Sequence, residues 1–240
     1  MGGCAMNDSF SFERFGKVLK MDFGNYVQSF GIRMLVLCLT PVALWIISIL
    51  GKFPVDIEVR GSFMVTLIGL ATILVPEKIY GHVNQPREGV GFAMLPATSS
   101  EKFFSMLVWC SLVTPLVCAL GLYLVDTLLT VLPFGGFKEY VTFVLSKPYG
   151  LVDASLFASI FLLISSVFMY GNVCFKKRKT GKTILAVLVA SFFMVCIGID
   201  PFLGISVSGD RSIWFGCIIR FVLAVLFWYL TYRRIKNQTY

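Results

Sequence analysis

The chain has 240 residues, of which 57% are hydrophobic and only 14% are charged, and its formal net charge is +8. Soluble domains carry about 25% charged residues. The composition therefore excludes an ordinary soluble protein and predicts one embedded in a membrane.

The N-terminal segment, residues 1–31, is predicted to hold an amphipathic helix. Its apolar residues recur at intervals of three and four: Phe15, Val18, Leu19, Phe23, Tyr26, Val27 and Phe30. Basic side chains such as Arg14, Lys17 and Lys20 lie among the polar positions. Such a helix suits the cytoplasmic headgroup layer of a membrane. It either anchors the amino terminus or offers a docking surface to a cytoplasmic partner.

Six apolar stretches follow, and each approaches the roughly 20 residues that a helix needs to cross the hydrocarbon core. The predicted spans are residues 32–50, 62–80, 103–132, 151–175, 184–199 and 212–232. The second is short because Pro76 and Glu77 close its apolar run, and the fifth ends at Asp200-Pro201. We therefore predict an all-α polytopic membrane protein whose transmembrane domain is 32–232.

Charge predicts the orientation of these spans. Most of the 21 Lys and Arg residues lie before the first span, in the loops after spans two and four, and in the tail 233–240. Cytoplasmic loops retain Lys and Arg, so both termini are predicted to be cytoplasmic. The run from Lys176 to Lys179 directly follows a span, where a basic cluster sets topology and contacts anionic lipid rather than nucleic acid.

The predicted cytoplasmic loop 81–102 ends in a helix-start signal. Thr98 and Glu101 fit the capping box, in which the threonine and the acid three residues later each bond the other's backbone N–H. Pro96 precedes them and favours a rigid turn. We expect a sharply started helix that feeds into the third span.

Ionisable residues inside spans are costly in lipid and indicate function. Arg220 lies within the sixth predicted span, Asp126 toward the outer end of the third, and Asp200 at the end of the fifth. Arg220 is predicted either to pair with Asp126 or Asp200, or to extend to the outer headgroups. These residues are structural, or they form an external gate or substrate pathway.

Proline occurs inside two spans. Pro41 and Pro115 each follow a threonine, whose hydroxyl can bond the carbonyl that proline frees. We expect a kink at each site.

The sequence lacks a catalytic constellation. Its one histidine, His82, lies in a polar loop, so neither a histidine-rich metal site nor a Ser–His pair within a span is expected. Gly181-Lys182-Thr183 lacks the first glycine of a phosphate-binding loop, because residue 176 is Lys. We predict no enzyme activity, no bound metal and no cofactor for this chain.

Residues 95–102, Leu-Pro-Ala-Thr-Ser-Ser-Glu-Lys, resemble the segment before the third span in permease subunits of ABC exporters of the type-two class. The amphipathic N-terminal helix, the six spans and the basic tail are also similar. The resemblance implies a bacterial inner-membrane protein whose Leu95, Pro96, Thr98 and Glu101 form a coupling element, with Lys102 linking it to the span. It also implies a separate ATP-binding subunit that uses ATP and Mg²⁺.

The chain departs from that family in its short second span and in the brief connection between spans five and six. The leading hypothesis is a permease subunit of an exporter, working with a second copy or a related permease. The alternative is a non-transporting membrane protein, such as an immunity, sensor or assembly factor, that binds another membrane protein.

Overall fold

The computed structural model describes residues 10–52, 55–81, 83, 97–132, 137, 150–175, 178–196 and 210–237, and this part of the chain is helical without strands. The elements are α1 (Phe12–Tyr26), the π-helical η1 (Val27–Gly31), α2 (Ile32–Gly51), α3 (Ile57–Tyr80), α5 (Ser99–Leu107), the π-helical η2 (Val108–Val113), α6 (Thr114–Val131), α7 (Gly150–Cys174), α8 (Lys179–Cys196) and α9 (Asp210–Lys236). The all-α prediction is confirmed.

Within the described part of the chain, five helices are long and apolar enough to cross a membrane: Phe12–Gly51, Ile57–Tyr80, Ser99–Val131, Ser155–Cys174 and Trp214–Lys236. The protein is therefore membrane-embedded. The predicted second span, 62–80, ends where α3 ends, at Tyr80, and α3 begins five residues earlier than predicted, at Ile57. α8, which holds the described part of the predicted fifth span, is not among these five helices, and residues 197–199 lie outside the described part. The count of six spans therefore stays a prediction.

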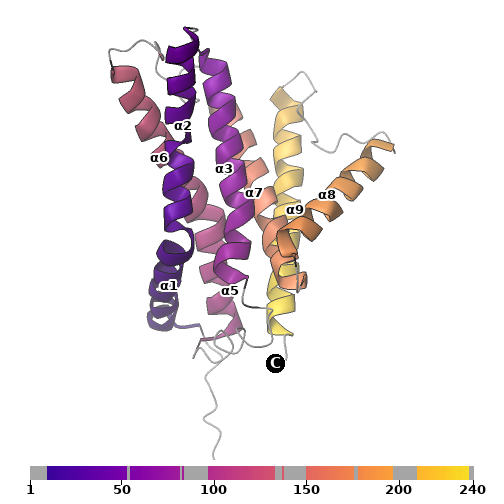
Figure 1. Ribbon diagram of the computed structural model, residues 1–240. Coiled ribbons are helices and arrows are strands. Elements are labelled where there is room, and N and C mark those ends of the chain that lie inside the picture. Colours follow the sequence, from indigo (N-terminus) through magenta and orange to yellow (C-terminus); the bar gives the residue numbers. More distant parts are fainter. Residues whose placement is uncertain are drawn as a thin grey trace, which may run out of the picture.

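The helices stand side by side as a bundle (Figure 1). α7 packs along α9, α3 contacts α6 and α7, and α2 lies against α6. α1 continues through η1 into α2, so the amphipathic helix leads directly into the first span. α8 diverges from the bundle, although its first turns contact α3 and α7 (Figure 1).

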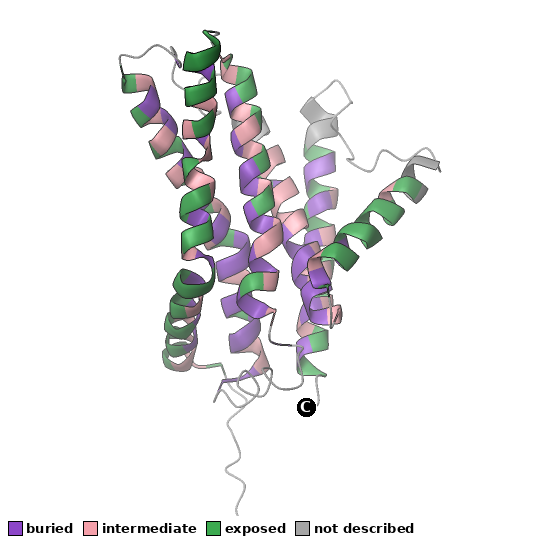
Figure 2. Cartoon of the chain, viewed as in Figure 1, coloured by how far each residue is buried: buried purple, intermediate pink, exposed green. Residues whose placement is uncertain are grey.

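The buried core lies close to the end of the bundle where α1 and α5 begin (Figure 2). Its best buried large side chains include Phe30, Tyr80, Met106 and Met169. The outer faces of α2, α8 and α9 expose Leu, Ile, Val and Phe, as expected where helices face lipid. Since lipid is as apolar as these side chains, the bundle depends on close packing and polar contacts rather than on the hydrophobic effect.

The threonine before Pro41 bonds the carbonyl that this proline frees, whereas the threonine before Pro115 bonds a different carbonyl. Thr40 Oγ1 donates to the Leu37 carbonyl, four residues before Pro41, at 2.6 Å, which confirms the expected compensation. Before Pro115 the chain instead forms η2, and both the N–H and the hydroxyl of Thr114 donate to the Trp109 carbonyl. The break in regular helical bonding therefore precedes Pro115 and spreads over a full π-helical segment.

α7 and α8 approach closely at Gly171. A methyl group on this residue would collide with the Thr183 side chain, which is itself buried and bonded to the Lys179 carbonyl at 2.8 Å. The absence of a side chain at Gly171 therefore permits the contact between these helices.

We predict that Gly171→Ala lowers the thermal midpoint of the purified protein, because overpacking a closely packed contact costs about 1–3 kcal/mol. The matched control is Gly61→Ala, since a methyl group there meets no atom within 4 Å. Tryptophan fluorescence during heating in mild detergent measures both midpoints. Equal midpoints for Gly171→Ala and the wild type would contradict the close approach.

Candidate functional site

The predicted capping box is present at the start of α5. The Glu101 N–H donates to Thr98 Oγ1 at 3.3 Å, and the Thr98 N–H donates to Glu101 Oε2 at 2.9 Å. Thr98 has extended backbone geometry and is the N-cap of the helix. This local pattern needs no tertiary contact, which is why the sequence alone predicted it.

Glu101 also joins α5 to α1, which the sequence did not predict. The backbone N–H of Ser11, the N-cap of α1, donates to Glu101 Oε1 at 2.8 Å. The Arg14 guanidinium lies 3.2 Å from the same oxygen. One carboxylate thus serves the N-termini of two helices, where the helix dipoles favour negative charge. We call Ser11, Arg14, Thr98 and Glu101 the Glu101 cluster.

The Glu101 side chain is completely buried (0% exposed), whereas that of Arg14 is partly exposed. A buried carboxylate is costly unless it is paired and hydrogen-bonded. Here the two N–H donors and the guanidinium satisfy both oxygens. The Glu101 cluster is therefore a fixed joint between the amphipathic helix and the predicted coupling element.

A second buried carboxylate, that of Asp22, attaches the C-terminal half of α1 to the bundle. Asp22 Oδ2 accepts hydrogen bonds from Tyr80 Oη at 2.8 Å and from Ser105 Oγ at 2.5 Å. These three buried residues, the Asp22 cluster, connect α1 with the end of α3 and with α5. Together the two clusters hold α5 against α1 at two points, near its start through Glu101 and near its end through Ser105.

Only part of the predicted apolar face of the N-terminal helix is buried in the structure. Val18, Tyr26 and Phe30 are buried, whereas Phe23 and Val27 are exposed. The buried stripe runs at four-residue intervals and includes Asp22. An acidic residue is unexpected at a buried position of such a stripe unless it has hydrogen-bond partners. The position of Asp22 in the stripe is therefore the signal from which its buried role could have been predicted.

The remaining predicted coupling residues are placed only in part. Lys102 is buried at the start of α5, beside Glu101 in the chain. Leu95 and Pro96 lie outside the described residues. The described portion of the predicted element is thus Thr98, Glu101 and Lys102.

The end of α3 and the start of α8 bond each other reciprocally. Lys179 Nζ donates to the Gly81 carbonyl at 2.6 Å, beside the C-terminus of α3. The Glu77 carboxylate accepts from the N–H and hydroxyl of Thr180, in the first turn of α8. Each charge complements the dipole of the helix end that it meets. Burial lowers the pKa of the Lys179 ammonium, and the nearby Glu77 carboxylate partly opposes this.

The predicted partner of Asp126 was wrong. Asp126 forms a two-pronged ion pair with Arg60 of α3: Arg60 Nε lies 3.1 Å from Oδ1 and Nη2 lies 2.5 Å from Oδ2. Both side chains are only 2% exposed, and Phe137 lies over the guanidinium, 4.1 Å from ring centroid to Cζ. Arg60 precedes the predicted second span, 62–80, but α3 begins at Ile57 and includes Arg60 among its buried residues.

Arg220 is buried within α9, as its place in a predicted span implied. Its Nη1 donates to Ser159 Oγ of α7 at 3.4 Å. The other predicted partner, Asp200, lies outside the described residues. Arg220 thus stands at the contact between α7 and α9.

The described residues contain no group of three His, Cys, Asp or Glu side chains that could hold a metal ion. No family model, no characterised protein and no solved structure matches the chain. What the described arrangement can do is mechanical: it fixes α5 to α1, and Tyr80 fixes Asp22 of α1 to the end of α3.

We predict that Asp22→Ala loosens α1 from the bundle. The change leaves the Tyr80 and Ser105 hydroxyls without this acceptor, and each buried group left unsatisfied costs about 1–3 kcal/mol. Trypsin should then cleave after Lys17 and Lys20 about tenfold faster or more, because local opening exposes the chain. Asp22→Asn keeps an acceptor oxygen and should cleave at an intermediate rate. Equal rates in Asp22→Ala and the wild type would show that the cluster does not retain α1.

We predict that Asp126→Ala lowers the thermal midpoint strongly, because it leaves Arg60 without its carboxylate in a buried place, at a cost of about 3–5 kcal/mol. The double variant Arg60→Met/Asp126→Leu removes both charges and should recover much of the loss. Fluorescence-detected melting in detergent compares the two. A double variant no more stable than Asp126→Ala would refute this role of the ion pair.

Proposed function

We propose that this chain is the membrane-spanning permease subunit of an ATP-driven exporter. A separate subunit binds ATP and Mg²⁺ and supplies the energy, and a second copy or a related permease completes the pathway. The chain has six spans, including α8, and lies in the bacterial inner membrane with both termini in the cytoplasm. These statements extend the sequence resemblance of residues 95–102.

The observation that carries the proposal is the Glu101 cluster. The resemblance assigns coupling to the segment that ends at Thr98 and Glu101, and Glu101 is bonded to Ser11 and Arg14 of the amphipathic helix. A force on this segment therefore reaches α5 and α1 together. A passive loop would not need a buried carboxylate shared by two helix N-termini.

The distribution of positive charge supports the orientation. Basic residues lie along α1, between α7 and α8 in the sequence, and in the last turn of α9. The start of α1, the start of α5 and the end of α9 lie at the same end of the bundle (Figure 1). By the positive-inside bias this end faces the cytoplasm, where an ATP-binding subunit would reach residues 95–101.

Movement would pass from α5 into α6 through η2. The helical bonding pattern is broken there, between Val108 and Val113, and Pro115 follows. Such a segment bends at lower cost than a regular helix. Closure of the ATP-binding subunits would thus tilt α5 and α1 as one body while α6 moves less.

The test is affinity purification of the full-length chain from its native host in mild detergent, with quantification of the ATP-binding subunit that co-purifies. Glu101→Ala removes an acceptor from the buried N–H groups of Ser11 and Thr98, at a cost of about 1–3 kcal/mol for each. If the partner needs this segment ordered, its recovery falls by about tenfold or more. The matched control is Glu13→Ala, which removes an exposed acid paired only to Lys17 among the ion pairs of the described residues.

Equal recovery of the ATP-binding subunit with Glu101→Ala and with Glu13→Ala would contradict coupling through Glu101. Recovery of the wild-type chain with another integral membrane protein, and without an ATP-binding subunit, would favour the non-transporting alternative.

A further inference from the structure

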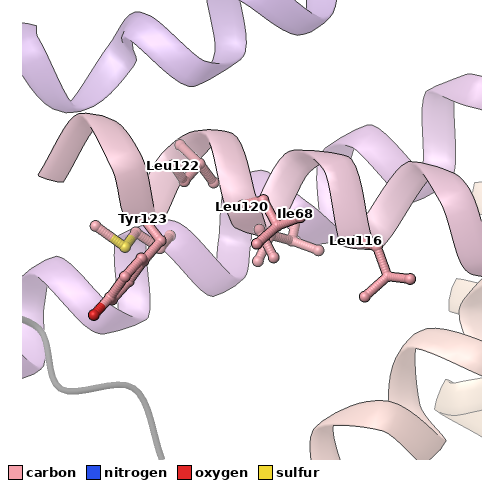
Figure 3. A pocket seen from close by; sticks show the side chains of 7 residues that line it. Ile68, Leu116, Leu120, Leu122 and Tyr123 are labelled. Carbon is pink, nitrogen blue, oxygen red and sulfur yellow. The ribbon is translucent and has the colours of Figure 1, made fainter. Parts of the chain in front are cut away.

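An apolar groove of about 280 Å³ lies between α3 and α6. Its lining consists of Met64 and Ile68 from α3 and Leu116, Ala119, Leu120, Leu122 and Tyr123 from α6. Of these seven side chains only that of Tyr123 carries an oxygen or nitrogen atom. Figure 3 shows Leu116, Leu120 and Tyr123 along one side of α6.

The spacing of the lining residues gives the groove its direction. Leu116, Ala119, Leu120 and Tyr123 follow one another at intervals of three and four, so they form a single stripe along α6. At a rise of about 1.5 Å per residue the stripe is about 10 Å long. The groove therefore runs parallel to the axis of α6, which is also the average direction of lipid chains around a transmembrane helix.

The position of the groove along α6 places it within the hydrocarbon core of the bilayer. Leu116 and Tyr123 lie about 22 Å and 12 Å from the Val131 end of their helix, at about 1.5 Å per residue. Their neighbours on the outer surface, Leu124 and Leu128, are exposed and apolar. The Arg60–Asp126 pair lies one helical turn beyond the groove and is sealed from it by burial.

We propose that this groove binds one acyl chain of a membrane phospholipid, which enters sideways from the bilayer between α3 and α6. The inference is independent of the proposed transport function. Water is a poor occupant because it needs two to four polar partners, and the lining offers one hydroxyl. The adjoining medium supplies linear hydrocarbon chains at high concentration, and these match the lining in polarity and the groove in shape.

The experiment reconstitutes the full-length protein in nanodiscs of phosphatidylethanolamine and phosphatidylglycerol that contain a small fraction of phospholipid with a diazirine in one acyl chain. Illumination inserts the chain into nearby side chains, and mass spectrometry maps the labelled residues. Met64, Ile68 and Leu122 are buried, at 3%, 3% and 1% exposure, so surrounding lipid reaches them poorly. We expect label on these three residues as well as on the exposed Leu116.

The variant Leu120→Trp fills the groove from its rim, and Leu124→Trp is the matched control. Both leucines are 62% exposed on α6, but only Leu120 lines the groove. Label on Met64, Ile68 and Leu122 should fall severalfold in Leu120→Trp and stay unchanged in Leu124→Trp. Label confined to Leu116, Leu124 and Leu128 in the wild type, or unchanged in Leu120→Trp, would overturn the proposal. The wild-type pattern decides the matter even if a variant does not fold.

Discussion

The hydrogen bonds of the buried Glu101 carboxylate are the interaction on which the rest of this structure depends. Removing a carboxylate from water is costly. The Glu101 carboxylate is stable here because the backbone N–H groups of Thr98 and Ser11 donate to it and Arg14 forms an ion pair with it. The arrangement is also directional: α1 and α5 both begin at this group, so its negative charge opposes neither helix dipole. Neither helix can leave without exposing buried donors at that point.

The two ends of the bundle are built differently. At the end where α1 and α5 begin, buried acids connect α1, α3 and α5, and the Glu77 and Lys179 contacts connect α3 with α8. Among the described residues of the opposite half, the principal polar contact is the Arg60–Asp126 pair. Between them lies η2, where α5 passes into α6. Under the proposed transport function, this contrast would let the bundle move at one end and rock about its middle.

Local patterns in the sequence predicted the parts of the fold that depend on local forces. The span limits agree with α2, α7 and α9 within a few residues, because hydrocarbon thickness sets helix length. The capping box was predicted because both of its bonds join Thr98 and Glu101. Arg60 was missed because it resembles an ordinary polar residue until a distant helix supplies its partner, whereas Asp22 had one local signal, its place in the buried stripe of α1. Tertiary pairing over long separations leaves little local signal.

The central claim, that Glu101 fixes α1 to the start of α5, is tested most directly by a distance between spin labels. One label replaces Lys17 on α1 and the other Phe104 on α5, both exposed, in a background without the seven native cysteines. Pulsed electron paramagnetic resonance in nanodiscs should give a narrow distance distribution in the parent and a broad one with Glu101→Ala. An equally narrow distribution in both proteins would contradict the claim.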